Sequence, residues 1–127
     1  MSYVWIGIGS AIGGMSRYWC SGVAARLLGE TLPWGTILVN ILGSLIIGFV
    51  ATIMPTDSRI LAVYDTRDFI MIGVLGGYTT FSAFSLQTLN LAREGHWFLA
   101  VLNVFLSVSL CLIAVWIGHI TATAITR

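Results

Sequence analysis

The sequence predicts an all-α membrane protein with four transmembrane helices, the third of which is broken at its centre. Of its 127 residues, 57% are hydrophobic and 9% are charged, whereas soluble domains carry about 25% charged residues. Because a membrane-spanning helix needs about 20 apolar residues, the chain has room for about four spans with short connections. We therefore expect residues 1–127 to form one transmembrane domain.

Charged residues separate the apolar runs and so set the predicted spans, which are 3–26, 32–54, 69–91 and 97–123. Pro33 fits the first turn of the second helix, where its missing N–H costs nothing. The N-terminal run has no preceding basic region and is longer than the apolar core of a signal peptide, so we interpret it as a retained span. The tryptophans lie mostly near span ends, as expected at membrane interfaces: Trp5, Trp19, Trp34, Trp97 and Trp116.

The third span contains the most informative segment of the chain. Residues 69–92 include no charged side chain, yet 73–85 combines three glycines with hydroxyl side chains and two phenylalanines. We expect the glycines to interrupt the helix there. Backbone outside a helix at membrane depth is tolerated only where it is buried in protein or lines a polar cavity. The segment is therefore the predicted functional site.

Polar side chains follow three of the spans and form a neutral stripe on each. The stripes are Thr36, Asn40 and Ser44 in the second span, Phe81, Phe84, Ser85 and Thr88 in the third, and Asn103, Ser107 and Cys111 in the fourth. One interpretation is interhelical hydrogen bonding, with Gly13, Gly43 and Gly48 allowing close approach. The other is an ion pathway. No span holds a carboxylate, and amide, hydroxyl and aromatic-edge groups suit a small anion.

Composition also excludes several classes of protein. A net charge of +1 without a basic patch argues against nucleic acid as a partner. Cys20 and Cys111 fall within apolar runs, and no Cys or His cluster has metal-ligand spacing, so we interpret both as small hydrophobic side chains.

Arginine positions bear on the orientation in the membrane, because Lys and Arg near span ends decide topology. The face with both termini carries Arg59, Arg67 and Arg127, the opposite face carries Arg26 and Arg93, and the chain has no lysine. This near balance permits insertion in both orientations and antiparallel pairing. A single orientation set by one charge stays open.

The segment GGYTTFSAFS at 76–85 resembles the GG-x-TTFSTFS signature of the Fluc fluoride-channel family, also called CrcB-like fluoride exporters. The resemblance extends to 9–18, 35–43 and 102–105. It implies a fluoride channel, not an enzyme, through which fluoride leaves the cell passively across a bacterial inner membrane. It also implies an antiparallel, dual-topology homodimer with two pores, each assembled from both subunits.

The resemblance implies roles for individual residues as well. Main-chain carbonyls of Gly76 and Thr79 would hold a structural sodium ion on the dimer axis. The fluoride pathway maps to Asn40, Thr80, Phe81, Phe84 and Ser107, and the first-span arginine, a structural or vestibule residue, maps to Arg17. The chain departs from the family at Ala83, where Thr is common, and at Gln87, where Glu is usual.

Two other classes of protein compete with a fluoride channel. A proton-coupled transporter of the small multidrug-resistance type needs a glutamate within the first span, and residues 1–29 contain no Asp or Glu. A non-transporting membrane subunit would give the polar stripes no function, but the sequence alone does not exclude this class of protein.

Overall fold

The computed structural model describes residues 2–54 and 61–127, which form helices and connecting turns. In chain order the elements are α1 (Ser2–Leu28), α2 (Trp34–Ile53), α3 (Leu61–Asp68), the π-helix η1 (Phe69–Leu75), α4 (Gly76–Tyr78), α5 (Phe81–Arg93) and α6 (Trp97–Ile125). Arg59, which entered the count of arginines on each face, lies outside the described residues.

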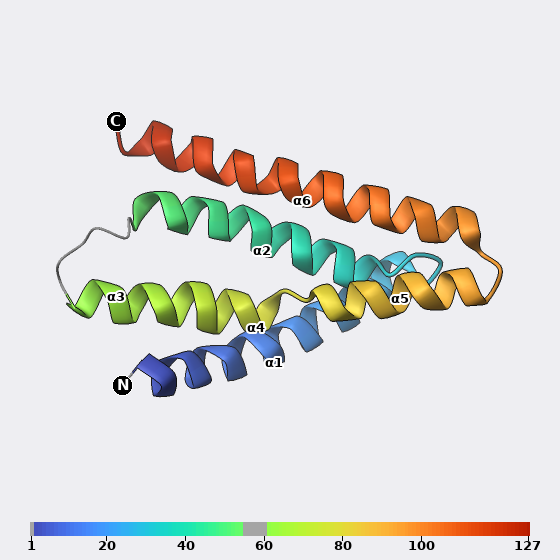
Figure 1. The fold of residues 1–127 in the computed structure, drawn as a ribbon, viewed down its shortest axis with the longest axis horizontal. Coiled ribbons are helices and arrows are strands. Elements are labelled where there is room, and N and C mark those ends of the chain that lie inside the picture. Colours follow the sequence, from blue (N-terminus) through green and yellow to red (C-terminus); the bar gives the residue numbers. More distant parts are fainter. Residues whose placement is uncertain (1, 55–60) are drawn as a thin grey trace.

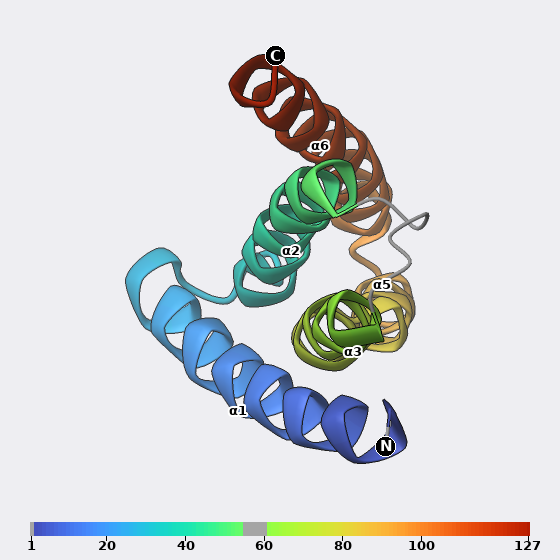
Figure 2. The ribbon, with the colours of Figure 1, turned by 90° about the vertical axis from the view of Figure 1, so that its left-hand side faces the viewer.

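The elements run back and forth along the long axis of the molecule (Figure 1), with α1, α2, the run from α3 to α5, and α6 as successive passes. The α3, η1 and α4 helices follow one another directly, and α5 continues roughly in line after a short extended link. In the end view, α2 lies between α1 and α6 (Figure 2), and η1 and α4 pack against α1. Both chain ends lie at the same end of the molecule, as an even number of passes requires.

Three helical segments of the described residues are long and apolar enough to cross a membrane: Trp34–Ile53, Asp65–Arg93 and Trp97–Ile125. The remaining predicted span, 3–26, corresponds to α1, a helix of 27 residues that is less apolar than α2 and α6. The membrane class and the helical fold are thus confirmed, while the crossing by α1 stays a prediction.

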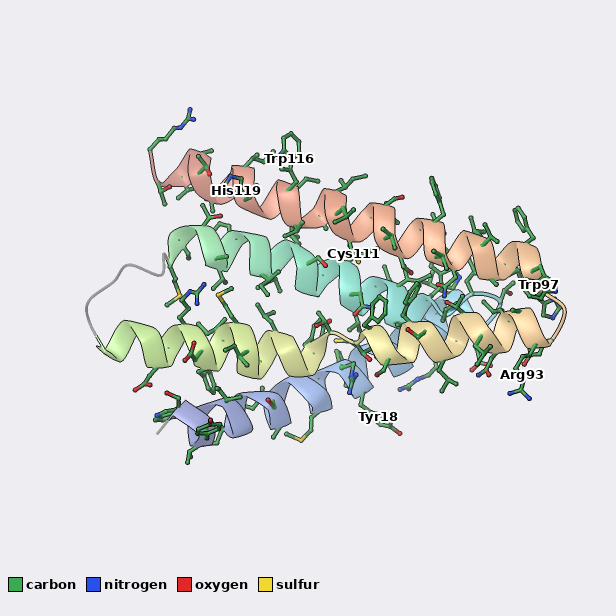
Figure 3. All side chains as sticks on the ribbon, in the orientation of Figure 1. Tyr18, Arg93, Trp97, Cys111, Trp116 and His119 are labelled. Atoms are coloured by element: carbon green, nitrogen blue, oxygen red, sulfur yellow. The ribbon has the colours of Figure 1, made fainter. Side chains whose placement is uncertain are left out.

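On α1 and α6, small side chains lie inside and large apolar ones outside, as in many membrane proteins. The buried residues of α1 are Gly9, Gly13 and Ala24, and those of α6 are mostly alanine and glycine. Tyr18 and Trp116 point from α1 and α6 away from the other helices (Figure 3). Lipid is as apolar as these side chains, so helix association here depends on close packing of small residues.

Close packing of α1 against the third pass depends on glycine. A Cβ at Gly13 would collide with the carbonyl oxygen of Val74 and lie 2.8 Å from the amide nitrogen of Tyr78. From the other side, a Cβ at Gly77 would lie 2.6 Å from the carbonyl oxygen of Ser10. The two backbones therefore touch directly, which a larger residue at either position prevents.

Glycines also allow α2 to pack closely against α6. A Cβ at Gly48 would collide with the carbonyl oxygen of Val115, and one at Gly118 would collide with that of Leu45. The expectation that Gly13 and Gly48 allow close helix approach is confirmed.

The third pass begins earlier than the predicted start at residue 69, because its charged residues are helical rather than part of a loop. Arg67 Nε donates to the carbonyl oxygen of Met54 at 3.1 Å, which caps the end of α2. The Ser2 hydroxyl donates to Asp65 Oδ1 at 3.2 Å. Because Asp65 and Arg67 have these partners, they can lie within a helix. Their charge therefore did not mark the start of the third pass.

Candidate functional site

The third pass leaves the helix at Thr79 and Thr80, not at the glycines. Thr79 has φ −85° and ψ 159°, and Thr80 has φ −153° and ψ 119°, both extended. Gly76 is right-handed helical at φ −63°, and the described glycines with positive φ are Gly29 and Gly95, in turns. The prediction that glycine conformation interrupts the helix is wrong, because Gly77 serves close packing against α1.

Asn40 holds the extended link through both polar atoms of its side chain. The Thr80 N–H donates to Asn40 Oδ1 at 2.8 Å, and Asn40 Nδ2 donates to the Thr80 carbonyl oxygen at 2.9 Å. The side-chain amide thus pairs with the backbone of one residue as a neighbouring β-strand would. These two bonds satisfy backbone groups that the helix cannot, as a break at membrane depth requires.

This arrangement releases the two carbonyls that were predicted to bind sodium. In a continuous helix, the Thr80 N–H would donate to the Gly76 carbonyl and the Ala83 N–H to the Thr79 carbonyl. Here the first donor is bonded to Asn40, and the Ala83 N–H donates to Thr80 Oγ1 at 3.2 Å. Both carbonyl oxygens therefore lack their helical donor.

Freed carbonyls fit a hard monovalent cation better than a transition metal. Hard cations prefer oxygen ligands, and the described residues include no group of three His, Cys, Asp or Glu that could hold a metal. A cavity of about 170 Å³ adjoins the break, and its lining includes Asn40, Ser44, Gly76 and Thr79. The residues present are thus compatible with a sodium ion held by main-chain oxygens.

The α5 helix begins with an N-cap from Thr80, the same residue that Asn40 holds. Thr80 Oγ1 accepts the Ala83 N–H and lies 3.3 Å from Ser82 Oγ. A threonine at this position satisfies one of the free amides of the first helical turn. Thr80 therefore ends the break and starts the helix that carries both phenylalanines.

Phe81 and Phe84 lie in contact but face different surroundings. Their ring centroids are 5.4 Å apart with planes at 52°. Phe81 is 76% exposed, whereas Phe84 is 8% exposed. Along the predicted common face of α5, Phe81 and Ser85 are exposed, whereas Phe84 is buried and Thr88 bonds to α6.

A chain of hydrogen bonds links α6 to the turn of α5 that carries Phe84. Ser107 Oγ donates to Asn103 Oδ1 at 3.4 Å, and Asn103 Nδ2 donates to Thr88 Oγ1 at 2.9 Å. Thr88 Oγ1 in turn donates to the Phe84 carbonyl at 2.8 Å. Sequence reasoning placed Thr88 and Asn103 on stripes but not in the site, although an asparagine in so apolar a helix was a signal.

The predicted site residues thus form two groups joined by α5. One group is the clamp of Asn40 on Thr80, and the other links Phe84 to Ser107. Arg17 lies half-buried on α1 and belongs to neither.

Gln87, which stands where the resemblance expects Glu, borders a separate cavity. This cavity has a volume of about 310 Å³, and its lining includes Glu30 and Glu94. Gln87 Oε1 is buried without a hydrogen-bond partner among the described residues. Because residue 87 is a neutral amide, the carboxylates that line this cavity come from Glu30 and Glu94.

Fold and site together define a multi-pass membrane protein built around a broken helix, with neutral hydrogen-bonding side chains and aromatic rings beside the break. The chain belongs to the CrcB-like family: the family model described as CrcB-like protein, Camphor Resistance (CrcB), matches residues 4–119. The predicted family membership is thereby confirmed, and with it the localisation as a multi-pass integral membrane protein.

Relatives match the chain over nearly its whole length. A protein of Paramagnetospirillum magneticum named fluoride-specific ion channel FluC is 50% identical over 127 residues, covering 100% of this chain and 99% of the relative. Proteins of the same name from Rhodospirillum rubrum and Opitutus terrae are 51% and 53% identical, covering 100% and 97% of this chain and 98% and 93% of the relatives.

Proposed function

We propose that this protein is a fluoride-selective ion channel through which fluoride leaves the cell passively. The observation that carries the proposal is the identity of about half of all residues, over the full chain, with relatives named fluoride-specific ion channels. The broken helix supports it, because its surroundings offer hydrogen-bond donors and aromatic rings without a carboxylate among the lining residues.

Fluoride binds water strongly, so a pore must replace the water shell with donors at several sites and still let the ion leave. Asn40 Nδ2 carries two hydrogens, of which the Thr80 carbonyl takes one, so the second is available to an ion. Phe81 and Phe84 offer electropositive ring edges, and Ser107 offers a hydroxyl whose bond to Asn103 is long at 3.4 Å. These groups together form the proposed fluoride pathway.

The proposal includes an antiparallel, dual-topology homodimer with two pores and a central sodium ion. The exposure of Phe81 supports pairing, because a single copy leaves this ring of the pathway uncovered. The released carbonyls of Gly76 and Thr79 would hold the sodium, two from each copy across a two-fold axis. Bound there, the ion would supply a fixed positive charge that favours anions nearby.

The competing transporter mechanism lacks the group it needs. Proton-coupled exchange of cations requires a carboxylate within the first span, and α1 contains none. No residue of α1 can therefore exchange protons as a carboxylate would, and we do not propose coupled transport.

Efflux from proteoliposomes tests the proposal. Purified protein is reconstituted into liposomes that contain either potassium fluoride or potassium chloride. A potassium ionophore is then added, so that K+ can leave together with the anion, and an ion-selective electrode measures the anion released. We expect rapid release of fluoride and retention of chloride. Equal rates for both anions, or fluoride release no faster than from protein-free liposomes, would contradict the proposed function.

A further inference from the structure

Asn103 is a polar side chain completely enclosed in the protein. It is 0% exposed and, among the residues that the structure describes, is one of the three largest fully buried side chains, with Ile37 and Val39. A buried amide is costly unless its polar atoms are bonded. Both polar atoms of Asn103 are bonded, Oδ1 to Ser107 and Nδ2 to Thr88.

Thr88 fixes the direction of this network. Its hydroxyl has one hydrogen, which it donates to the Phe84 carbonyl at 2.8 Å, so toward Asn103 the Thr88 oxygen is an acceptor. Asn103 must therefore present Nδ2 to Thr88 and Oδ1 to Ser107. The bonds run in one direction, from Ser107 through Asn103 and Thr88 to the backbone of Phe84.

In the described structure, a single polar contact joins this part of α5 to α6. Among the described residues, the bond from Asn103 to Thr88 is the one hydrogen bond between the two helices. An open apolar cavity of about 660 Å³ lies beside it, lined by residues of both helices that include Leu89, Val101 and Phe105. The bond between Asn103 and Thr88 is thus the polar contact through which α6 reaches the turn that carries Phe84.

We propose that Asn103 is a positioning residue for Phe84 in the fluoride pathway. Through its bond to Thr88, Asn103 of α6 fixes the turn of α5 between Phe84 and Thr88, and so sets the position of the Phe84 ring edge. Asn103 itself does not touch the ion, because its side chain is fully enclosed. This inference rests on the proposed function and adds a residue that acts through another.

Thr88→Val separates positioning from direct ion contact. It removes the hydroxyl that receives Asn103 but leaves the Asn103 amide in place. Thr121→Val is the matched control, because Thr121 Oγ1 makes the same bond to the carbonyl four residues earlier, at 2.8 Å, on an exposed surface. Thr88→Ser keeps the hydroxyl and is the conservative rescue.

Fluoride and chloride efflux are measured per folded protein for wild type, Thr88→Val, Thr88→Ser, Thr121→Val and Asn103→Leu. Interhelical hydrogen bonds in membranes vary in strength, and their range corresponds to roughly threefold to tenfold in a rate. We expect Thr88→Val and Asn103→Leu to lose fluoride flux by that factor and to gain relative chloride leak. Thr88→Ser and Thr121→Val should match wild type.

The dependence on Phe84 gives the decisive comparison. In a Phe84→Ile background, Thr88→Val should cause no further loss of flux, because both changes act through one ring. Full additivity there, or wild-type flux and selectivity in Thr88→Val, would overturn the inference even if Asn103→Leu fails to fold. A wild-type protein that does not conduct fluoride would instead refute the proposed function.

Discussion

Asn40 and Thr80 are joined by two hydrogen bonds, of 2.8 and 2.9 Å, which pair a side-chain amide of α2 with the backbone of a residue forty positions away. The pair satisfies the backbone of the extended link and redirects the amide that would otherwise bond to the Gly76 carbonyl. One asparagine thus stabilises the break and leaves the Gly76 carbonyl oxygen without its helical donor.

The N-cap of α5 should contribute measurably to stability. Replacing a capping threonine costs about 1 kcal/mol, and Thr80 Oγ1 accepts the Ala83 N–H. We expect Thr80→Val to lower the free energy of unfolding in detergent by about that amount, and Thr80→Ser to keep most of it. Equal stability of the two variants would show that the cap is unimportant.

The phenylalanine pair should separate conduction from folding. Phe81 is exposed in one copy, so Phe81→Ile should leave the folded yield nearly unchanged, whereas Phe84→Ile changes a buried ring. An aromatic edge contact is worth about 1 kcal/mol, so fluoride efflux from proteoliposomes should fall roughly fivefold in at least one variant. Normal conduction by both would make the two rings ordinary packing.

Adjacent glycines of α1 provide a matched pair for the helix packing. A Cβ at Gly13 would collide with Val74, whereas one at Gly14 would meet nothing within 4 Å. Overpacking costs about 1–3 kcal/mol, so Gly13→Ala should lower the thermal midpoint and the monodisperse yield in gel filtration. Gly14→Ala should behave as wild type, and similar losses in both variants would contradict the packing described.

Gly76 tests the proposed dimer axis. Within one copy, the nearest atom to a Cβ at this position is the Met71 carbonyl oxygen at 3.7 Å, an ordinary contact. Gly76→Val should therefore leave helix content, measured by circular dichroism, unchanged, and reduce dimer formation and fluoride flux by crowding a partner copy. A fully dimeric and conducting variant would place Gly76 away from any axis.

Much of the fold followed from the sequence, because apolar runs of membrane length specify helices directly. The helices α1, α2 and α6 begin and end within two residues of the predicted spans. The start of the third pass was misplaced, since the partners of Asp65 and Arg67 come from α1 and from the end of α2. Such contacts are properties of the assembled fold.

The sequence pointed to residues around the break but not to the geometry of the break. Asn40 and Thr80, which the sequence singled out, lie at the break and Phe84 follows in the first turn of α5, but the break was assigned to glycines. A glycine can provide either positive φ or close helix approach, and the sequence does not distinguish these roles. The pairing of Asn103 with Thr88 depends on how α5 lies on α6, which no spacing within either helix specifies.

Fluoride efflux through Asn40→Asp tests most directly whether the helix break is the ion pathway. The carboxylate keeps an acceptor for the Thr80 N–H but removes both amide hydrogens and puts an acceptor where an anion would pass. The bond to the Thr80 carbonyl is lost as well, so the folded yield should fall, and the fluoride efflux per folded, reconstituted protein should be abolished. Wild-type fluoride efflux through folded Asn40→Asp would contradict the account.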